Sequence, residues 1–148
     1  MLTSKPVKFK MACADQFLRV KNWILGCDYL ALSELWSVFY VRKLESDDNV
    51  PISYGDVVTI ESRETGEILS HTPTGYISLE SKRIIEPYSL WLLVNPHDPK
   101  STEQIKDRCE VVMYNRMWND CAIEADTSDE WVCTSSDVGM GCVWVVCL

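Results

Sequence analysis

The chain has 148 residues, of which 47% are hydrophobic and 24% are charged, and its formal net charge is −8. This size and composition predict one globular domain with a sizeable core and exclude a disordered chain. Affinity for phosphate groups depends largely on Lys and Arg, so the acidic balance argues against general binding of nucleic acid. No apolar run reaches the length of a membrane span, and we expect no membrane insertion.

Residues 1–43 are the basic exception, with seven Lys and Arg against three acidic residues. We interpret these cations as a solvated strand face rather than a nucleic-acid patch. The first residues lack the hydrophobic stretch of a signal peptide, so we expect a cytoplasmic protein. If a signal peptide has been removed, the secretory pathway or the ER lumen is the alternative.

Short apolar runs separated by turn residues predict strands along the whole chain. They recur in three sets, each with a hairpin, a middle strand and a strand that contains tryptophan. The first set has its hairpin at 7–18, its middle strand at 29–32 and its tryptophan at Trp36. The second has them at 58–69, 76–79 and Trp91, and the third at 112–123, 131–134 and Trp144. A helical pattern is confined to at most one turn near 101–107.

A unit of about 50 residues cannot bury its own apolar face, so three such units are expected to share one core. Three repeats of four short strands resemble the β-trefoil, in which six strands form a barrel and three hairpins cap one end. We therefore predict an all-β β-trefoil in one domain with pseudo-threefold symmetry. The expected repeats cover about 1–50, 51–104 and 105–148.

Six positions shared by the repeats are predicted to form the core. They are Leu18, Leu69 and Ile123, with the tryptophans Trp36, Trp91 and Trp144. A large indole at one position of every repeat is most economically a core layer. The alternative is that these tryptophans form an aromatic triad facing a ligand.

The second repeat resembles a MIR repeat. Gly55 precedes a Val-x-Ile strand, Thr65-Gly66 forms the turn, Leu69-Ser70-His71 follows, and Trp91 closes the unit. MIR repeats occur in protein O-mannosyltransferases, in stromal-cell-derived-factor-like proteins of the ER, and in inositol trisphosphate and ryanodine receptors. The resemblance implies a β-trefoil fold with ligand and partner surfaces. Residues 72–79 depart from the usual Gly/Ser/Gln-rich sequence, and the Arg/Lys cluster of an inositol-phosphate site is missing.

The seven cysteines lie at positions 13, 27, 109, 121, 133, 142 and 147. Their odd number and the lack of any Cys-x-x-Cys pair favour free thiols, which we expect to be mostly buried. The same spacing argues against structural zinc. The acidic segment 124–130 lacks the glycine of a calcium loop, so we predict no metal and no cofactor.

No catalytic motif occurs in the sequence. His71 ends a hairpin strand, and His97 lies in a Pro-rich loop. Thiol catalysis would require a cysteine beside His97, and nothing in the sequence places one there. We therefore predict that the chain is not an enzyme.

The remaining prediction is a monomeric binding module whose loops recognise a protein or a glycan. Trp118 at a hairpin tip is the expected anchor, because indole faces stack on sugars and on partner side chains; its alternative role is to cover the barrel end. The candidate ligand-binding residues are Trp118, Asn119, Asp120, Thr65, His71 and Tyr76, with Asp15, Gln16 and Glu64 as further contacts.

Two other functions are compatible with the same fold. Some β-trefoils inhibit proteases through an exposed loop, and here the segment 95–106, with Pro96 and Pro99, is the candidate. Others bundle actin, which requires tandem trefoils or a dimer.

Overall fold

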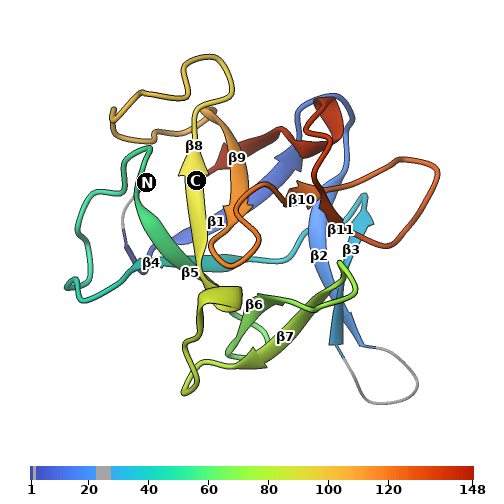
Figure 1. The fold of residues 1–148 in the computed structure, drawn as a ribbon, viewed down its shortest axis with the longest axis horizontal. Coiled ribbons are helices and arrows are strands. Elements are labelled where there is room, and N and C mark those ends of the chain that lie inside the picture. Colours follow the sequence, from blue (N-terminus) through green and yellow to red (C-terminus); the bar gives the residue numbers. More distant parts are fainter. Residues whose placement is uncertain (2, 23–27) are drawn as a thin grey trace.

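The computed structural model describes residues 1, 3–22 and 28–148, and within them the chain is all-β with two short 3-10 turns (Figure 1). The strands are β1 (Pro6–Met11), β2 (Phe17–Asn22), β3 (Asp28–Ser33), β4 (Phe39–Lys43), β5 (Val57–Ser62), β6 (Glu67–His71), β7 (Ile77–Ser81), β8 (Trp91–Val94), β9 (Glu110–Asn115), β10 (Ala122–Glu124), β11 (Cys133–Ser135) and β12 (Trp144–Cys147). The 3-10 turns are η1 (Pro87–Ser89) and η2 (Met140–Cys142), each just before a strand. No helix in the described ranges is long and apolar enough to cross a membrane.

The twelve strands form one antiparallel sheet, and six of them close into a ring. Strand β1 pairs with β4 and β12, β4 with β5, β5 with β8, β8 with β9, and β9 with β12. Inward and outward side chains alternate along these strands; on β1, Val7, Phe9 and Met11 are buried. This period of two places one face of every ring strand in a common core.

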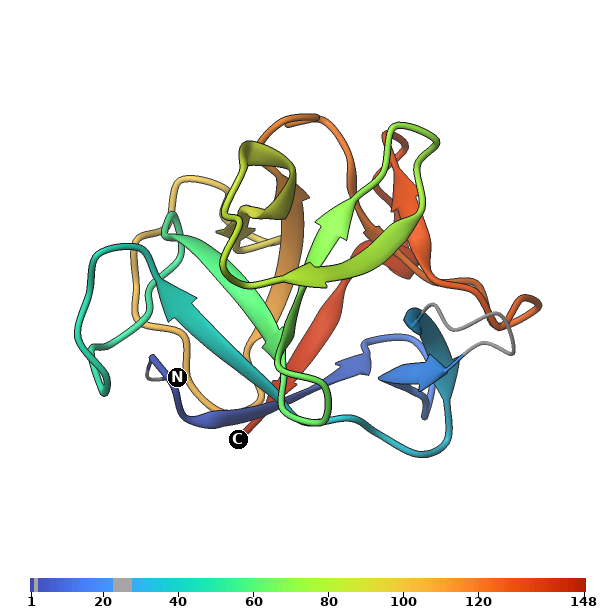
Figure 2. The same cartoon turned by 90° about the horizontal axis from the view of Figure 1, so that it is seen from below.

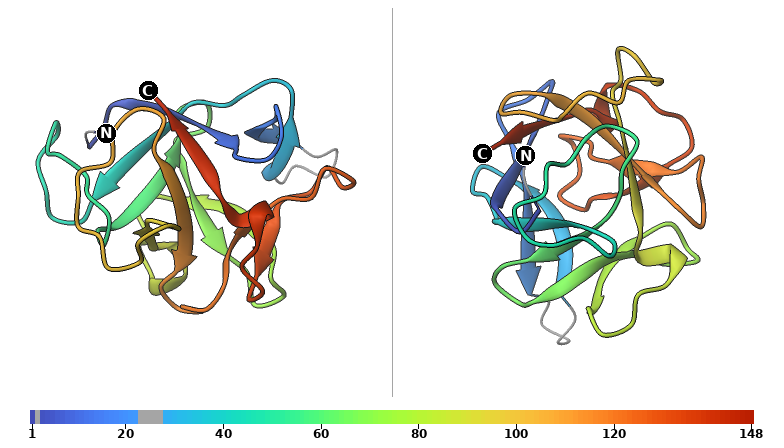
Figure 3. Two further views of the ribbon diagram at one scale, coloured as in Figure 1. Left: turned by 90° about the horizontal axis from the view of Figure 1, so that it is seen from above. Right: turned by 90° about the vertical axis from the view of Figure 1, so that its left-hand side faces the viewer.

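The other six strands form the hairpins β2–β3, β6–β7 and β10–β11. These hairpins lie toward one end of the ring, away from the two loops 44–56 and 95–109 (Figure 2). Both chain ends lie with the loops (Figure 3). We refer to the two ends as the hairpin end and the loop end.

Five of the six predicted core residues are confirmed. Leu18, Leu69 and Ile123 are fully buried, as are Trp91 and Trp144. The indole Nε1 of Trp91 donates to the carbonyl oxygen of Leu69 (3.0 Å), and that of Trp144 to the carbonyl oxygen of Ile123 (3.1 Å). Each indole therefore fills the core and satisfies its polar atom there.

The prediction for Trp36 is wrong, because its side chain is 47% exposed. Strands β8 and β12 begin at their tryptophans, whereas β4 begins at Phe39, which is buried against Phe9 (5.9 Å between ring centroids). The backbone N–H of Ser37 donates to the Leu18 carbonyl (3.1 Å), so no indole is needed there. Trp36 instead lies outside, against Phe17 and under the Lys8 ammonium.

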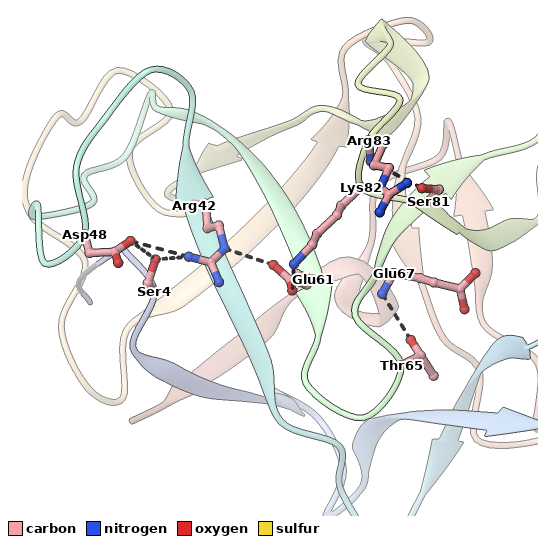
Figure 4. Close-up of polar contacts among 9 residues, drawn as sticks. All are labelled: Ser4, Arg42, Asp48, Glu61, Thr65, Glu67, Ser81, Lys82 and Arg83. Atoms are coloured by element: carbon pink, nitrogen blue, oxygen red, sulfur yellow. Dashed lines mark hydrogen bonds and ion pairs between the residues drawn. The ribbon is translucent and has the colours of Figure 1, made fainter.

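A buried carboxylate joins the ring to the second hairpin (Figure 4). Glu61 on β5 accepts from Arg42 Nε on β4 (2.9 Å) and pairs with Lys82 Nζ after β7 (3.1 Å). Glu61 is almost fully buried, while both cations reach solvent. Because an unpaired buried charge is costly, this cluster holds the base of β6–β7 against the ring.

The six described cysteines are free thiols, as predicted, and Cys27 lies outside the described residues. The expectation that they are mostly buried is wrong. Of the six described cysteines only Cys142 is buried, and Cys13 is exposed. The cysteines of β11 and β12, Cys133 and Cys147, lie at half-buried positions of those strands rather than in the core.

Candidate functional site

Three backbone bridges join the hairpins to one another. Tyr29 pairs with Ser78, Tyr76 with Cys133, and Trp131 with Ala31. In each bridge an aromatic residue from one hairpin meets a small residue from the next. The bridges therefore close a triangle at the hairpin end of the ring.

Side chains at the triangle alternate between the core and the surface. Leu30, Ile77 and Val132 point inward and are buried. The residues just before them, Tyr29, Tyr76 and Trp131, point the other way, and we call these three the cap triad. All three line an open hollow of 450 Å³, the cap groove, whose lining residues are Asp28, Tyr29, Thr72, Tyr76, Ile77, Ser78, Asp129 and Trp131.

One wall of the cap groove is a stacked aromatic pair. The rings of Tyr29 and Trp131 lie 4.1 Å apart at an interplanar angle of 24°. The Tyr29 hydroxyl donates to Glu130 Oε1 (2.9 Å), which also accepts from Lys21 Nζ (2.8 Å). Burial and the bond to Glu130 raise the pKa of Tyr29, while the bonds from Lys21 and Tyr29 lower the pKa of Glu130. These contacts orient the pair on the hairpin surface.

The facing wall is built by the turn between β6 and β7. The Thr72 hydroxyl accepts from the Tyr76 N–H (3.1 Å), and the Thr72 N–H donates to the Tyr76 carbonyl (2.8 Å). Gly75 has φ +89°, a conformation that favours glycine. The turn leaves Tyr76 with 55% of its surface exposed, although its backbone is fixed.

Carboxylates surround the cap groove. Asp28 and Asp129 line it, and Glu67 lies beside Asp28 and Glu80. Burial and the neighbouring Asp28 carboxylate raise the pKa of Glu67. Among the described residues, none of these four acids forms an ion pair, whereas Glu130 is paired with Lys21. The groove is therefore aromatic and negatively charged.

A second, smaller hollow of 380 Å³ adjoins the cap groove and shares Thr72 and Ser78 with it. His71 and Trp118 stack in its wall, with ring centroids 4.4 Å apart. His71 Nε2 lies 2.6 Å from the Thr134 hydroxyl, which donates to the Gly75 carbonyl (3.1 Å). The imidazole therefore donates to Thr134, and burial lowers the pKa of His71.

Buried Asn115 positions Trp118. Its Oδ1 accepts from the N–H groups of Met117 (3.0 Å) and Trp118 (3.3 Å), and its Nδ2 donates to the Tyr88 carbonyl (2.9 Å). This local turn after β9 brings a half-buried indole onto His71. Trp118 thus covers part of the hairpin end and also presents a surface to the smaller hollow.

The structure brings three of the predicted site residues together and separates the other three. His71, Tyr76 and Trp118 line the two adjoining hollows. Thr65 lies beyond the opposite end of β6, where its hydroxyl accepts from the Glu67 N–H (3.3 Å; Figure 4). Asn119 lines a different hollow, and Asp120 is exposed beside the Cys121 thiol.

The further candidates also lie outside the cap groove. Asp15 and Gln16 line a polar hollow at the β1–β2 turn. Glu64 accepts from the Ser37 hydroxyl (3.3 Å).

The hollow that contains Asn119 is larger, at 730 Å³, and includes Pro96, His97 and Pro99 of the predicted inhibitory segment. In this hollow His97 Nε2 already contacts Glu110 Oε2 (2.5 Å). The segment 95–106 is anchored at its end by buried Ile105, whose N–H donates to the Ile52 carbonyl (2.9 Å). This hollow lacks the aromatic and acidic convergence seen at the cap groove.

The sequence-based prediction missed most of the cap groove, including Tyr29, Trp131, Asp28 and Asp129. A signal for it was present: each middle-strand element of the three sets begins with an aromatic residue. Alternation in a strand places that first residue on the face opposite the buried second one. The described residues contain no group of three His, Cys, Asp or Glu that could hold a metal ion.

No protein-family model matches the chain, and no curated protein matches it in sequence. Solved structures do match over its full length. A Caenorhabditis elegans protein of unknown function superposes with a TM-score of 0.83 at 10% identity, covering 99% of this chain and 94% of that one. The SDF2-like protein from Arabidopsis thaliana gives 0.81 at 10% identity, covering 99% and 93%.

The structure of lysenin with phosphocholine also matches, with a TM-score of 0.73 at 11% identity, covering 100% of this chain and 45% of lysenin. At such low identity, these similarities show a shared fold and leave function open.

Proposed function

We propose that the chain is a β-trefoil of three four-stranded repeats, related to MIR domains, and that it is a binding module rather than an enzyme. The closed ring of six strands, the three hairpins at one end and the triangle of bridges support the trefoil. The full-length similarity to the SDF2-like protein supports the relation to MIR domains.

The observation that carries the binding proposal is the convergence of the cap triad on one groove. Three aromatic side chains from three separate hairpins point away from the core that their neighbours fill. The scaffold does not need Tyr76 to be exposed, since its turn is fixed by Thr72 and Gly75. Aromatic side chains that gather around an open hollow, here one exposed and two half-buried, are typical of interaction sites.

Binding of a protein partner is the function that the cap groove supports best. Tyr and Trp are enriched among the residues that dominate binding energy at protein interfaces. The linings of the cap groove and of the adjoining hollow together contain five aromatic side chains, Tyr29, Tyr76, Tyr88, Trp118 and Trp131, and the imidazole of His71.

A glycan is the second candidate. Besides the cap triad, the groove is lined by the hydroxyl-bearing residues Thr72 and Ser78. Aromatic faces with nearby hydrogen-bonding groups suit the alternating apolar and polar faces of a sugar ring.

The test is a peptide array and a glycan array probed with the wild type and with Tyr76→Ala, Trp131→Ala and Trp36→Ala. Trp36 is the matched control, since it is an exposed aromatic outside the groove. We expect both cap variants to lose about 2 kcal/mol or more of binding free energy, and the control about 0.5 kcal/mol or less. Equal binding by all four proteins would contradict the proposal, and loss on changing Pro96 or His97 would favour the inhibitory loop.

We further propose a monomer in the cytoplasm. Its support is the six free thiols, which suit a reducing compartment. Sedimentation of the reduced protein and localisation of a tagged full-length protein would test the two statements. A stable dimer would favour the bundling alternative.

A further inference from the structure

We infer that the cap groove binds arginine or lysine side chains of a basic segment in a partner protein. This inference rests on the proposed function, because it names the chemistry of the partner at the same groove. It is carried by two independent features of the groove: its aromatic faces and its unpaired carboxylates.

The aromatic faces suit a cation. The stacked pair Tyr29–Trp131 and the exposed Tyr76 all line the groove, so a side chain that enters it meets aromatic rings from all three hairpins. A cation is attracted to the face of an aromatic ring, most strongly to that of Trp. The planar guanidinium of arginine can also stack on such rings while its N–H groups remain directed outward.

The carboxylates supply the partners for those N–H groups. Asp28 and Asp129 line the groove on the same hairpin surface as the rings. Their present contacts use only part of their accepting capacity. Asp28 accepts from Asn22 Nδ2 (2.9 Å) and shares a hydrogen bond with Glu67, and one Asp129 oxygen accepts from the Trp131 N–H (3.0 Å). A carboxylate has about four lone-pair sites, so both can accept more bonds.

The charge around the groove is uncompensated. Glu67 lies beside both Asp28 and Glu80, and among the described residues none of these three acids, nor Asp129, forms an ion pair. The Lys21 ammonium on this surface forms its ion pair with Glu130. A bound cation would relieve the mutual repulsion of these carboxylates, for which the described residues offer the Glu67–Asp28 hydrogen bond but no ion pair.

The same charges argue against other occupants. An acidic peptide or a phosphate group would meet the Asp28 and Asp129 carboxylates, with Glu67 and Glu80 nearby, in a chain whose net charge is −8. A neutral glycan would leave them without compensation. A basic protein segment combines positive charge with apolar side-chain stems that can cover the rings.

The inference is tested by fluorescence anisotropy with two short labelled peptides, one of alternating Gly and Arg and one of alternating Gly and Gln. The proteins are the wild type, Tyr76→Ala, Asp129→Asn and the control Asp47→Asn. Asparagine at 129 keeps the oxygen that accepts from the Trp131 N–H, so the loop is preserved while the charge is removed. Asp47 is an exposed acid in the loop at the opposite end of the ring.

We expect the Gly–Arg peptide to bind and the Gly–Gln peptide to bind at least about tenfold more weakly. Tyr76→Ala and Asp129→Asn should each weaken Gly–Arg binding about tenfold or more, and Asp47→Asn less than about twofold. Binding should also weaken as salt rises from about 50 to 200 mM, because partly exposed charges are screened. Thermal melts of every variant establish that loss of binding is not loss of folding.

Each contrary result has a distinct meaning. If both peptides bind equally and Tyr76→Ala weakens both, the groove binds proteins but the inference about charge is overturned. If Asp47→Asn weakens binding as much as Asp129→Asn, attraction is general and the inference is overturned. If neither peptide binds but a glycan or phosphocholine does so in a Tyr76-dependent way, the basic partner is excluded and a different ligand occupies the groove.

Discussion

The ring and the hairpin end use similar aromatic side chains in opposite ways. Trp91 and Trp144 point inward at the start of ring strands, where each indole N–H finds a backbone carbonyl. Tyr29, Tyr76 and Trp131 point outward at the hairpin end and line a groove beside carboxylates. The difference shows that a repeated aromatic position indicates either a core or a site, and that the burial of the adjacent residues decides which.

The largest expected effect on stability comes from removing a buried tryptophan of the ring. Trp144→Ala should lower the free energy of unfolding by about 3–5 kcal/mol, since it leaves a cavity and an unpaired carbonyl at Ile123. Trp36→Ala should cost only about 1 kcal/mol, because its side chain is half exposed. Urea unfolding of the two variants measures both. Similar losses would mean that Trp36 belongs to the core after all.

On the hairpin side, Tyr76→Ala should separate binding from stability. We expect an unfolding free energy within about 0.5 kcal/mol of the wild type and a binding free energy reduced by about 2 kcal/mol or more. Chemical unfolding and ligand titration of the same sample give the two numbers. A variant that unfolds easily would show that Tyr76 is a structural residue.

Asn115 connects the two regions, because it is buried in the ring strand β9 and its side chain positions Trp118 at the hairpin end. The variant Asn115→Ala tests this connection. Losing its three hydrogen bonds should cost about 1–3 kcal/mol of stability. It should also free the Trp118 indole from His71, which a shift of the tryptophan fluorescence toward longer wavelength would report. Unchanged fluorescence would show that the stack itself holds Trp118.

Acid should weaken the hairpin end through His71. Burial lowers the pKa of His71 in the folded protein below its unfolded value of about 6.5, so the unfolded chain binds the proton more readily. The contribution of this group to stability is therefore present at neutral pH and is lost as the pH falls below about 6.5. Unfolding at a series of pH values should show a smaller acid loss in His71→Gln, and an identical loss would contradict this assignment.

Glu67 should make the protein less stable as the pH rises, which is opposite to the effect of His71, and this is the smallest of the expected effects. Burial and Asp28 raise its pKa in the folded protein, so its contribution to stability falls as the pH rises through that pKa. Glu67→Gln should therefore be slightly more stable than the wild type at pH 7, with the difference shrinking in acid. A basic peptide bound in the cap groove should remove this advantage.

Alternation and repetition predicted the all-β class and the buried positions Leu18, Leu69 and Ile123. The same reasoning failed at Trp36, because sequence spacing alone did not show that β4 begins at Phe39. Alternation could place each aromatic residue of the cap triad on the outer face of its strand, but their convergence on one groove depends on contacts between hairpins far apart in the chain. His71 and Trp118 were predicted as separate site residues, but their stacking requires the Asn115 turn and the Thr134 contact.

The most direct test of the central claim is a titration of the isotope-labelled protein with the Gly–Arg peptide, observed through the indole Nε1–H resonances. Binding at the cap groove should shift the Trp131 resonance and leave those of Trp91 and Trp144 nearly unchanged, because the latter two are buried and bonded in the ring. A Trp131→Phe variant assigns the resonance. Saturable binding that leaves Trp131 unshifted would contradict the placement of the site at the hairpin end.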